Sequence, residues 1–382
     1  MYKALIYDRL RSVMHKILSF AKKNAVMLIA ALAAIITSII VPLDKKYIDY
    51  FDFKTLTCLF CVLAVVCALR NIRFFYTMAK AIIRKFKNAK ICILALVYIT
   101  FIGSMLIAND MALLTFLPLG YFVLHTTGKE KYMAFTFIMQ NIAANLGGML
   151  TPFGNPQNLY LYSRFNIPDI EFVTIMFPPF IISIVLITAC CLIFVKSEPL
   201  VIEEKAASLP IPRVIIYLIL FAFSILIVFR TVPYYYGLII VPIAILILDR
   251  QALLQVDYGL LLTFVFFFIF SGNMARIDTV RDFFSFLLEK NTLVFSALSC
   301  QFISNVPSAI LLSQFTDNYR ELLLGVNIGG AGTMIASLAS LITFREYSKQ
   351  APGHTVRYLI KFSLFNFAFL GILILFCSIF GV

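Results

Sequence analysis

Two polar, glycine-rich stretches interrupt otherwise apolar sequence, and they hold the residues best suited to chemistry. They are NLGGMLTPFGNPQNL at 145–159 and NIGGAGTMIASLASL at 327–341. Asn, Ser and Thr offer neutral polar contacts without the cost of a buried charge, while glycine and proline allow a helix to break. Aligned without a gap, the stretches share five pairs of residues: Asn145/Asn327, Gly147/Gly329, Gly148/Gly330, Thr151/Thr333 and Leu159/Leu341.

A shorter polar break precedes each stretch. It is Ala108-Asn109-Asp110 in the first half of the chain and Ser304-Asn305-Val306 in the second. Broken helices expose N–H groups that bind anions and carbonyl groups that bind cations such as Na⁺. Interrupted apolar segments at corresponding places in two halves indicate the binding site of a membrane transporter. We therefore predict one site for small ions, built from both pairs of breaks.

The predicted site residues are the polar and small residues at these four breaks. Contact with substrate or coupling ion is predicted for Asn109, Asp110, Thr151, Asn155, Ser304, Asn305 and Thr333. Shaping of the breaks is predicted for Asn145, Gly147, Gly148, Asn327, Gly329 and Gly330, and the predicted substrate- and ion-binding set also includes Gly154 and Ser337. If the coupling ion is Na⁺, the predicted ligands are Asn109, Asp110 and Asn305.

Asp110 is the one acidic residue that we predict to lie deep in the membrane. Intramembrane carboxylates are costly and are functional by default. A bare carboxylate would repel a neighbouring anion, so Asp110 must be protonated, paired or holding a cation when an anion binds. We predict that Asp110 couples transport to H⁺ or Na⁺. The alternative is a protonated or capping Asp without a coupling role.

Composition places the chain in a bilayer. It is 62% hydrophobic and 13% charged, whereas soluble domains have about 45–50% apolar and about 25% charged residues. The net charge of +13 sits in short loops, as the positive-inside rule predicts, so we expect no nucleic-acid partner. No cluster of catalytic side chains, ATP-binding P-loop or metal-ligand spacing appears, which predicts neither an enzyme nor a bound cofactor beyond the coupling ion.

The elements that position these breaks are apolar helices. Spans of about 20 residues are predicted near 24–43, 55–70, 132–164, 171–195, 213–230, 236–249, 257–275, 320–343 and 356–381. Of these, 132–164 and 320–343 are broken helices. The segments 91–124 and 291–316 are apolar on both sides of a polar break, which favours re-entrant hairpins whose backbone faces protein or a water-filled cavity.

These elements predict two inverted-topology repeats, residues 1–195 and 213–382, joined by a cytoplasmic linker at 196–212. Most Lys and Arg residues fall in loops on one side of this topology, which favours a cytoplasmic N-terminus in the plasma membrane. The basic segment 70–90 alternates Arg and Lys with apolar residues, typical of an amphipathic helix on an anionic leaflet, with specific lipid recognition as the alternative. Arg276 and Arg281 lie near the predicted outer mouth.

At these motifs the chain resembles a known group. ANDMALLTFLPL, ANLGGMLTPFGNPQN, SNVPSAILL and VNIGGAGTMIASLASL resemble the ion transporter superfamily, in its citrate-transporter-like, anion-permease branch. That branch includes divalent-anion/Na⁺ symporters and arsenite permeases. The resemblance implies an all-α polytopic membrane protein with inverted repeats, often a homodimer, that moves a transport domain against a scaffold like an elevator.

The tip motifs depart from those of the dicarboxylate symporters, whose Ser-Asn-Thr tips contact Na⁺ and substrate carboxylate. Here the second tip keeps Ser304-Asn305 but has Val306, and the first keeps only Asn109. The proline turn Gly154-Asn155-Pro156 has no counterpart in the second half. An Asn-Asp tip and a Ser337-containing second break are more similar to arsenite and related anion permeases.

The sequence thus predicts a secondary active transporter of a small anion, coupled to Na⁺ or H⁺. The anion is a di- or tricarboxylate such as citrate or succinate, or an inorganic oxyanion such as arsenite. The alternative is a Na⁺/H⁺ antiporter in which Asp110 carries the cation or proton and no anion crosses.

Overall fold

The computed structural model describes residues 14, 24–200 and 209–381. In this part of the chain the regular structure is helical apart from one isolated bridge between Asn88 and Pro199. Six of the described helices are long and apolar enough to cross a membrane: Phe53–Asn71, Ala89–Ile107, Asp169–Phe194, Ile211–Val228, Tyr258–Ala275 and Thr355–Phe380. The prediction of an all-α polytopic membrane protein is confirmed.

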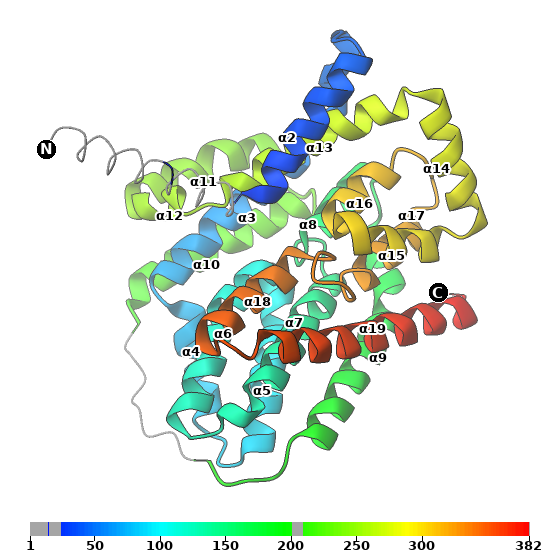
Figure 1. Ribbon diagram of the computed structural model, residues 1–382. Helices are drawn as coiled ribbons and strands as arrows, with labels where there is room; N and C mark the ends of the chain where they lie inside the picture. The colour runs from blue at the N-terminus through cyan, green and yellow to red at the C-terminus, as the bar shows by residue number, and fades with distance from the viewer. Residues whose placement is uncertain (1–13, 15–23, 201–208, 382) are drawn as a thin grey trace, which may run out of the picture. The chain divides into compact units, whose positions relative to one another are not determined.

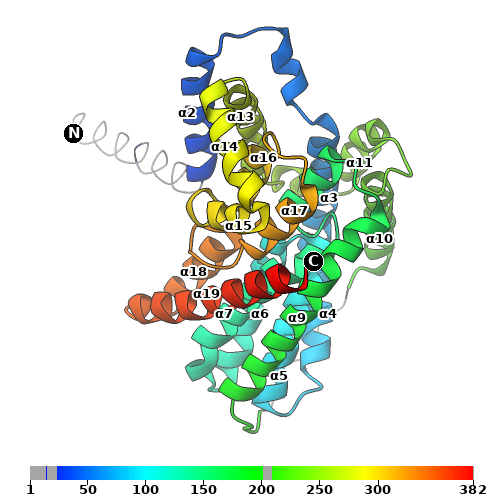
Figure 2. The same cartoon turned by 90° about the vertical axis from the view of Figure 1, so that its right-hand side faces the viewer.

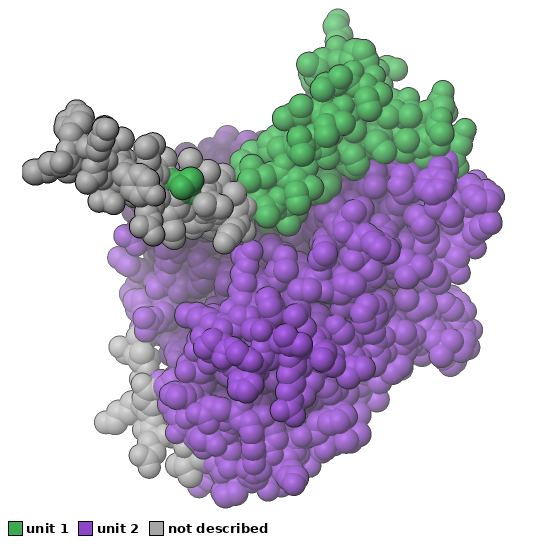
Figure 3. Space-filling view, in the orientation of Figure 1, with its two compact units in different colours: residues 1–52, 257–282 green, residues 53–256, 283–382 purple. Residues whose placement is uncertain are grey.

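The chain forms two compact units, coloured separately in Figure 3. The first unit, residues 1–52 and 257–282, contains α2 (Ala25–Ile40), η1 (Lys45–Tyr50), α13 (Tyr258–Ala275) and the start of α14 (Asp278–Lys290). Within it, α2 packs along α13.

Polar contacts hold this unit together. Asn273 Nδ2 on α13 donates to Thr37 Oγ1 at 3.3 Å and to Ser38 Oγ at 3.2 Å. Arg276 binds both carboxylate oxygens of Asp44, at 3.1 and 2.7 Å, and these hydrogen bonds lower the pKa of Asp44. Arg276 therefore has an acidic partner within its own unit.

The second unit, residues 53–256 and 283–382, holds both predicted hairpins and both predicted broken helices. Its elements from the first half of the chain are α3 (Phe53–Asn71), α4 (Phe74–Ile83), α5 (Ala89–Ile107), α6 (Asn109–Thr126), η2 (Glu130–Tyr132), α7 (Met133–Gly147), η3 (Gly148–Leu150), α8 (Pro156–Arg164) and α9 (Asp169–Phe194). Figures 1 and 2 show them in blue to green.

The remaining elements of this unit come from the second half of the chain. They are α10 (Ile211–Val228), α11 (Tyr234–Leu248), α12 (Arg250–Leu254), most of α14, α15 (Thr292–Ile303), α16 (Asn305–Leu312), α17 (Tyr319–Ile328), α18 (Leu338–Gln350) and α19 (Thr355–Phe380). Between α9 and α10, residues 201–208 of the predicted linker lie outside the described residues.

The same packing arrangement occurs twice in this unit. The first arm of each hairpin packs on the first part of its own broken helix, α5 on α7 and α15 on α17. The second arm packs on the second part of the other broken helix, α6 on α18 and α16 on α8 (Figures 1 and 2). Each hairpin is therefore held by both halves of the chain. The inverted orientation of the halves and the repeat boundaries stay predictions.

The two hairpins differ in length. At about 1.5 Å per residue, the 19-residue α5 is about 28 Å long, close to a membrane thickness of about 30 Å. The 12-residue α15 and 8-residue α16 are much shorter.

The predicted spans at 24–43 and 236–249 contain helices of 16 and 15 residues.

The basic segment 70–90 does not form one long helix. Arg73 has a φ of 56°, a left-handed conformation that ends the helical path of α3 and starts α4, which has only 10 residues. The segment after α4 then leads to Asn88, whose side chain caps α5. The amphipathic helix in this segment is therefore shorter than the basic pattern predicts.

Candidate functional site

Both hairpin tips adopt the same unusual conformation. Ala108 and Ser304 have φ values of 65° and 74°, which are strained for residues other than glycine. The asparagine after each begins a helix, and its Oδ1 accepts a hydrogen bond from the next backbone N–H at 2.9 Å, that of Asp110 or of Val306. Backbone strain of this kind persists where the surroundings hold it in place, and it clusters at ligand sites.

Each tip is tied to the break of its own broken helix by an equivalent hydrogen bond. The Asn109 N–H donates to the Gly154 carbonyl at 3.1 Å, and the Asn305 N–H donates to the Ala336 carbonyl at 2.9 Å. Gly154 and Ala336 align with each other in the duplicated stretches. Tip and break therefore form one rigid polar assembly in each half.

The paired threonines have a structural partner in the hairpins. Thr151 Oγ1 donates to the Met105 carbonyl at 2.7 Å, and Thr333 Oγ1 donates to the Gln301 carbonyl at 2.9 Å. Both acceptors lie four residues before the tip asparagine. These threonines therefore hold each break against its hairpin arm. Their contact with substrate stays a prediction.

Buried amides connect the two broken helices. Asn327 Oδ1 accepts from Asn155 Nδ2 at 3.3 Å and from Gln157 Nε2 at 3.4 Å. Asn327 Nδ2 donates to Asn158 Oδ1 at 2.6 Å and to the Leu323 carbonyl at 2.8 Å. With an exposed fraction of 1%, Asn327 joins α17 to the start of α8.

The two tips meet at Asn145 and Gly330. Asn109 Nδ2 donates to Asn145 Oδ1 at 3.2 Å. A methyl group on Gly330 would lie 3.2 Å from Asn305 Nδ2 and 3.6 Å from Asn145 Oδ1. Both tip asparagines therefore flank one spot, bordered by the end of α7 and by the break after α17.

The other predicted glycines are places of close backbone approach. A methyl group would lie 2.3 Å from the Phe101 carbonyl oxygen at Gly147, 2.4 Å from Asn155 Oδ1 at Gly148 and 2.3 Å from the Gly148 carbonyl oxygen at Gly154. At Gly329 it would lie 2.7 Å from the Gly325 carbonyl oxygen and 2.8 Å from Cys300 Sγ. Only glycine fits these four positions without movement of the neighbours.

The remaining predicted residues lie at helix N-termini. Asp110 is half-buried in the first turn of α6. Ser304 Oγ donates to Asn305 Oδ1 at 3.3 Å. Ser337 is the N-cap of α18, and its Oγ accepts from the Ser340 N–H at 3.2 Å. All fifteen predicted site residues thus belong to the tips and the breaks, within one compact unit.

Four helices begin in this assembly: α6, α8, α16 and α18. Helix N-termini carry partial positive charge and N–H groups that favour anions. Four helices, α5, α7, α15 and α17, end there, and helix C-termini favour cations. The arrangement can therefore bind an anion and a cation side by side without a buried Lys or Arg.

Some buried oxygens here suit a cation. Asn155 Oδ1 and Gln157 Oε1 are buried and lack a hydrogen-bond partner among the described residues. Amide oxygens are hard ligands of the kind that alkali and alkaline-earth cations prefer. Within the described part of the chain, no three His, Cys, Asp or Glu side chains gather as metal ligands.

Several polar residues of the site were not predicted as site residues. Gln157 and Asn158 lie in the duplicated stretch, and their polarity next to the proline turn was the available signal. Gln301 is 8% exposed; its Nε2 donates to the Gly329 carbonyl at 2.9 Å and its Oε1 accepts from the Thr333 N–H at 2.8 Å. The available signal for Gln301 was a single amide residue in apolar sequence, four residues before the tip asparagine Asn305.

Comparison with known proteins shows the family of this chain. Residues 13–319, which include both hairpins and the first broken helix, match the citrate transporter family. The chain belongs to the citrate transporter family. This protein is therefore a membrane transporter and not an enzyme, as the sequence predicts.

Two curated relatives extend the comparison. An uncharacterized transporter of Methanocaldococcus jannaschii is 34% identical over 313 residues, which cover 81% of this chain and 85% of the relative. The inner membrane protein YbiR of Escherichia coli is 28% identical over 282 residues, covering 71% of this transporter and 74% of the relative. The similarity to both spans most of each chain.

Proposed function

We propose that this transporter is a secondary active carrier of a small anion, coupled to Na⁺ or H⁺. The anion is a di- or tricarboxylate such as citrate or succinate, or an inorganic oxyanion such as arsenite. Membership of the citrate transporter family favours a carboxylate. The tip sequences, with Asp110 and Val306 where symporters have Thr, favour a smaller oxyanion.

One observation carries the proposal: both hairpin tips flank the same spot. The Asn109 side chain donates to Asn145 on one side of this spot, and the Asn305 side chain lies next to Gly330 on the other. The N-termini of α6 and α16 begin at these asparagines, so an anion between them would meet positive helix ends on both sides. The neutral amides would then select by hydrogen bonding at low desolvation cost.

The coupling ion would bind beside the anion. Asn109, Asp110 and Asn305 are the proposed ligands if the ion is Na⁺, and the buried oxygen of Asn155 is available nearby. A cation there would neutralise Asp110 and remove its repulsion of the anion, which makes binding of the two ions cooperative. A proton on Asp110 would have the same effect.

We propose an elevator-type movement, a homodimeric assembly and a plasma-membrane location with a cytoplasmic N-terminus. The family resemblance, which implies a transport domain moving against a scaffold and often a homodimer, supports the first two. The relative YbiR is an inner membrane protein, which supports the location. Duplicated hairpins suit alternating access better than a continuous pore.

Thermal stability of the purified protein across citrate, succinate, phosphate and arsenite, with and without Na⁺, at two pH values, tests this proposal. A ligand of the folded state stabilises by about 2.7 kcal/mol at a hundredfold excess over its Kd. Stabilisation by one anion, deepened by Na⁺ or by acid, is the expected result. Stabilisation by Na⁺ or pH alone, with every anion silent, would favour the Na⁺/H⁺ antiporter instead.

A further inference from the structure

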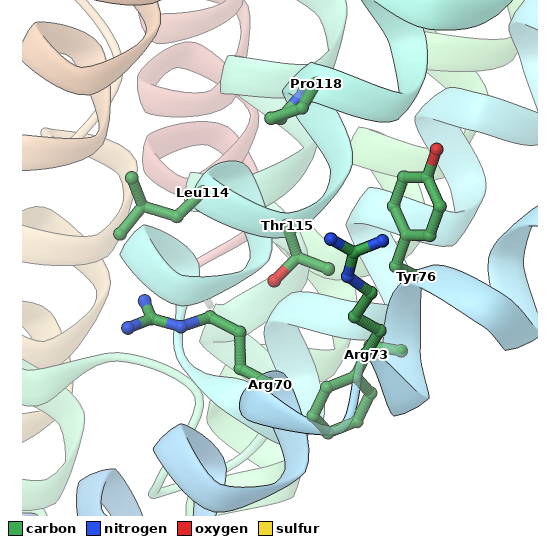
Figure 4. Close-up of a pocket in the computed structure, with 7 residues that line it drawn as sticks. Arg70, Arg73, Tyr76, Leu114, Thr115 and Pro118 are labelled. Carbon is green, nitrogen blue, oxygen red and sulfur yellow. The ribbon is translucent and has the colours of Figure 1, made fainter. Parts of the chain in front are cut away.

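A basic pocket lies in the same unit, lined by residues other than those of the tips and breaks. It has a volume of about 340 Å³ and is lined by Arg70, Arg73, Phe75, Tyr76, Leu114, Thr115 and Pro118. These residues come from the end of α3, the start of α4 and the middle of α6. In the view of Figure 4 the Thr115 side chain lies between the two arginine guanidinium groups.

The pocket has the chemistry of an oxyanion site. A planar guanidinium group presents a fork of N–H donors that matches phosphate or carboxylate. Thr115, whose hydroxyl donates to the Met111 carbonyl, and Tyr76 also line the pocket, and none of the seven described lining residues is acidic. Two permanent positive charges thus share one pocket without a carboxylate in its lining.

Arg70 is held by neutral groups. Its Nη1 lies 3.4 Å from Met111 Sδ, and its Nη2 lies 3.3 Å from Gln255 Oε1. Neither contact neutralises the charge, and sulfur is a weak acceptor. The guanidinium is therefore positioned while its charge stays available to a ligand.

Arg73 is presented by a strained turn. Its φ of 56° and ψ of 29° place it in the left-handed region, and its N–H donates to the Arg70 carbonyl at 2.8 Å. A bulky residue rarely adopts this conformation, and such strain is concentrated at ligand sites. The turn brings Arg73 into the same pocket as Arg70.

We propose that this pocket binds an oxyanion group, phosphate or carboxylate, between Arg70 and Arg73. The group comes either from an anionic lipid headgroup or from a soluble anion. The apolar lining residues Phe75 and Leu114, and the exposed Met78 and Ile82 on α4, suit a lipid. The inference does not rest on the function proposed for the hairpin tips, because it uses other residues.

The test uses three variants of the full-length protein. Arg70→Gln and Arg73→Asn remove the pocket charges, and Asn tolerates the left-handed conformation at position 73. Arg84→Asn is the matched control, since Arg84 is exposed on the same basic segment and does not line the pocket. Melting temperatures without added ligand verify that each variant folds.

Binding is measured in two arms. In one, the proteins are placed in nanodiscs of phosphatidylcholine with or without phosphatidylglycerol, and stabilisation and retained lipid are measured. In the other, detergent-solubilised protein is titrated with potassium phosphate against potassium chloride at equal ionic strength. We expect apparent binding to weaken about tenfold or more in both pocket variants, and to be unchanged in Arg84→Asn.

Each outcome decides. An effect of the pocket variants in the lipid arm alone identifies a headgroup site, and an effect in the phosphate arm alone identifies a soluble-anion site. If Arg84→Asn loses as much binding as Arg73→Asn, the interaction is diffuse surface charge and the proposal is wrong. It is equally wrong if the pocket variants match the wild type in both arms.

Discussion

At the scale of single residues, Asn327 joins the two broken helices. Its amide makes four hydrogen bonds to α8, to the break before α8 and to its own helix, and it is buried. Replacement by alanine would leave the Asn155, Gln157 and Asn158 side chains without this partner. Each buried unsatisfied polar group costs roughly 1–3 kcal/mol. We expect Asn327→Ala to lower the melting temperature strongly in detergent solution.

Thr333→Ala is the matched comparison for this prediction. Thr333 lies in the same break but is partly exposed, and its side chain donates one hydrogen bond. Its loss should cost about 1 kcal/mol. Equal melting temperatures for the two variants would contradict the role assigned to Asn327.

Gly330 separates binding from folding. A methyl group there would lie 3.2 Å from both Asn305 Nδ2 and the Asn327 carbonyl oxygen, which is tight but leaves no overlap as severe as at Gly147, so Gly330→Ala should fold. It would fill the spot that the two tips flank, and we expect at least roughly tenfold weaker anion binding, about 1.4 kcal/mol. Titration with the anion that stabilises the wild type measures this change.

Gly147→Ala is the opposite case. Its methyl group would lie 2.3 Å from the Phe101 carbonyl oxygen, a backbone atom that cannot easily move. Overpacking of this kind costs about 1–3 kcal/mol, so we expect lost stability.

Unchanged anion binding by a folded Gly330→Ala would show that the ligand lies elsewhere.

The residue pairs of the site could be predicted, but their partners could not. Identical residues at a constant offset matched Thr151 with Thr333, and the structure gives both the same kind of hydrogen bond. The acceptors are the main-chain carbonyls of Met105 and Gln301. Every residue has such a carbonyl, so the residue type does not indicate which one accepts the hydrogen bond. The amide contacts of Asn327 cross between halves, so no local pattern indicated them.

At the scale of elements, polarity within apolar sequence located the hairpins and the breaks, but helix lengths were harder to predict. The 19-residue α5 is long enough to cross a membrane, whereas the corresponding arm of the second hairpin, α15, has only 12 residues. The 10-residue α4 is shorter than its basic pattern because of the conformation of Arg73. Neither feature changes the hydrophobic period, so the sequence does not reveal it.

The start of the linker is an element whose role the sequence did not predict. Glu198 accepts hydrogen bonds from Lys129, Lys131 and Tyr132, which lower its pKa from 4.5 to about 2. The Glu198 carbonyl also accepts from the Ala89 N–H at 2.8 Å, at the start of α5. These contacts attach the linker to the base of the first hairpin.

This attachment predicts a pH-dependent stability. A carboxyl whose pKa is lowered by folding stabilises fully above its unfolded value of 4.5, and that contribution disappears as the pH falls towards 2. Glu198→Gln should therefore melt below the wild type at pH 7, and the difference should narrow from pH 5 to pH 3. A constant difference across this range would contradict the assignment.

At the scale of the whole molecule, coupling is the property that turns binding into active transport. Asp110 lies in the first turn of α6, directly after the tip asparagine that contacts Asn145. Its carboxylate adds negative charge beside the proposed anion. The molecule can load both only if this charge is paired, protonated or balanced by a cation, because like charges repel strongly where water is scarce. We predict that the balancing charge is the coupling ion.

Asp110→Asn should therefore uncouple the transporter. The amide removes the repulsion without a cation, so anion binding should persist while its dependence on Na⁺ or on pH becomes flat, and transport against a gradient should be lost. Counterflow and gradient-driven uptake in proteoliposomes separate these two activities. Asp282→Asn, which removes an exposed acidic residue, is the control and should behave as the wild type. Retained ion dependence in Asp110→Asn would assign the coupling charge to another group, whereas loss of both activities with a normal melting temperature would make Asp110 part of the binding site itself.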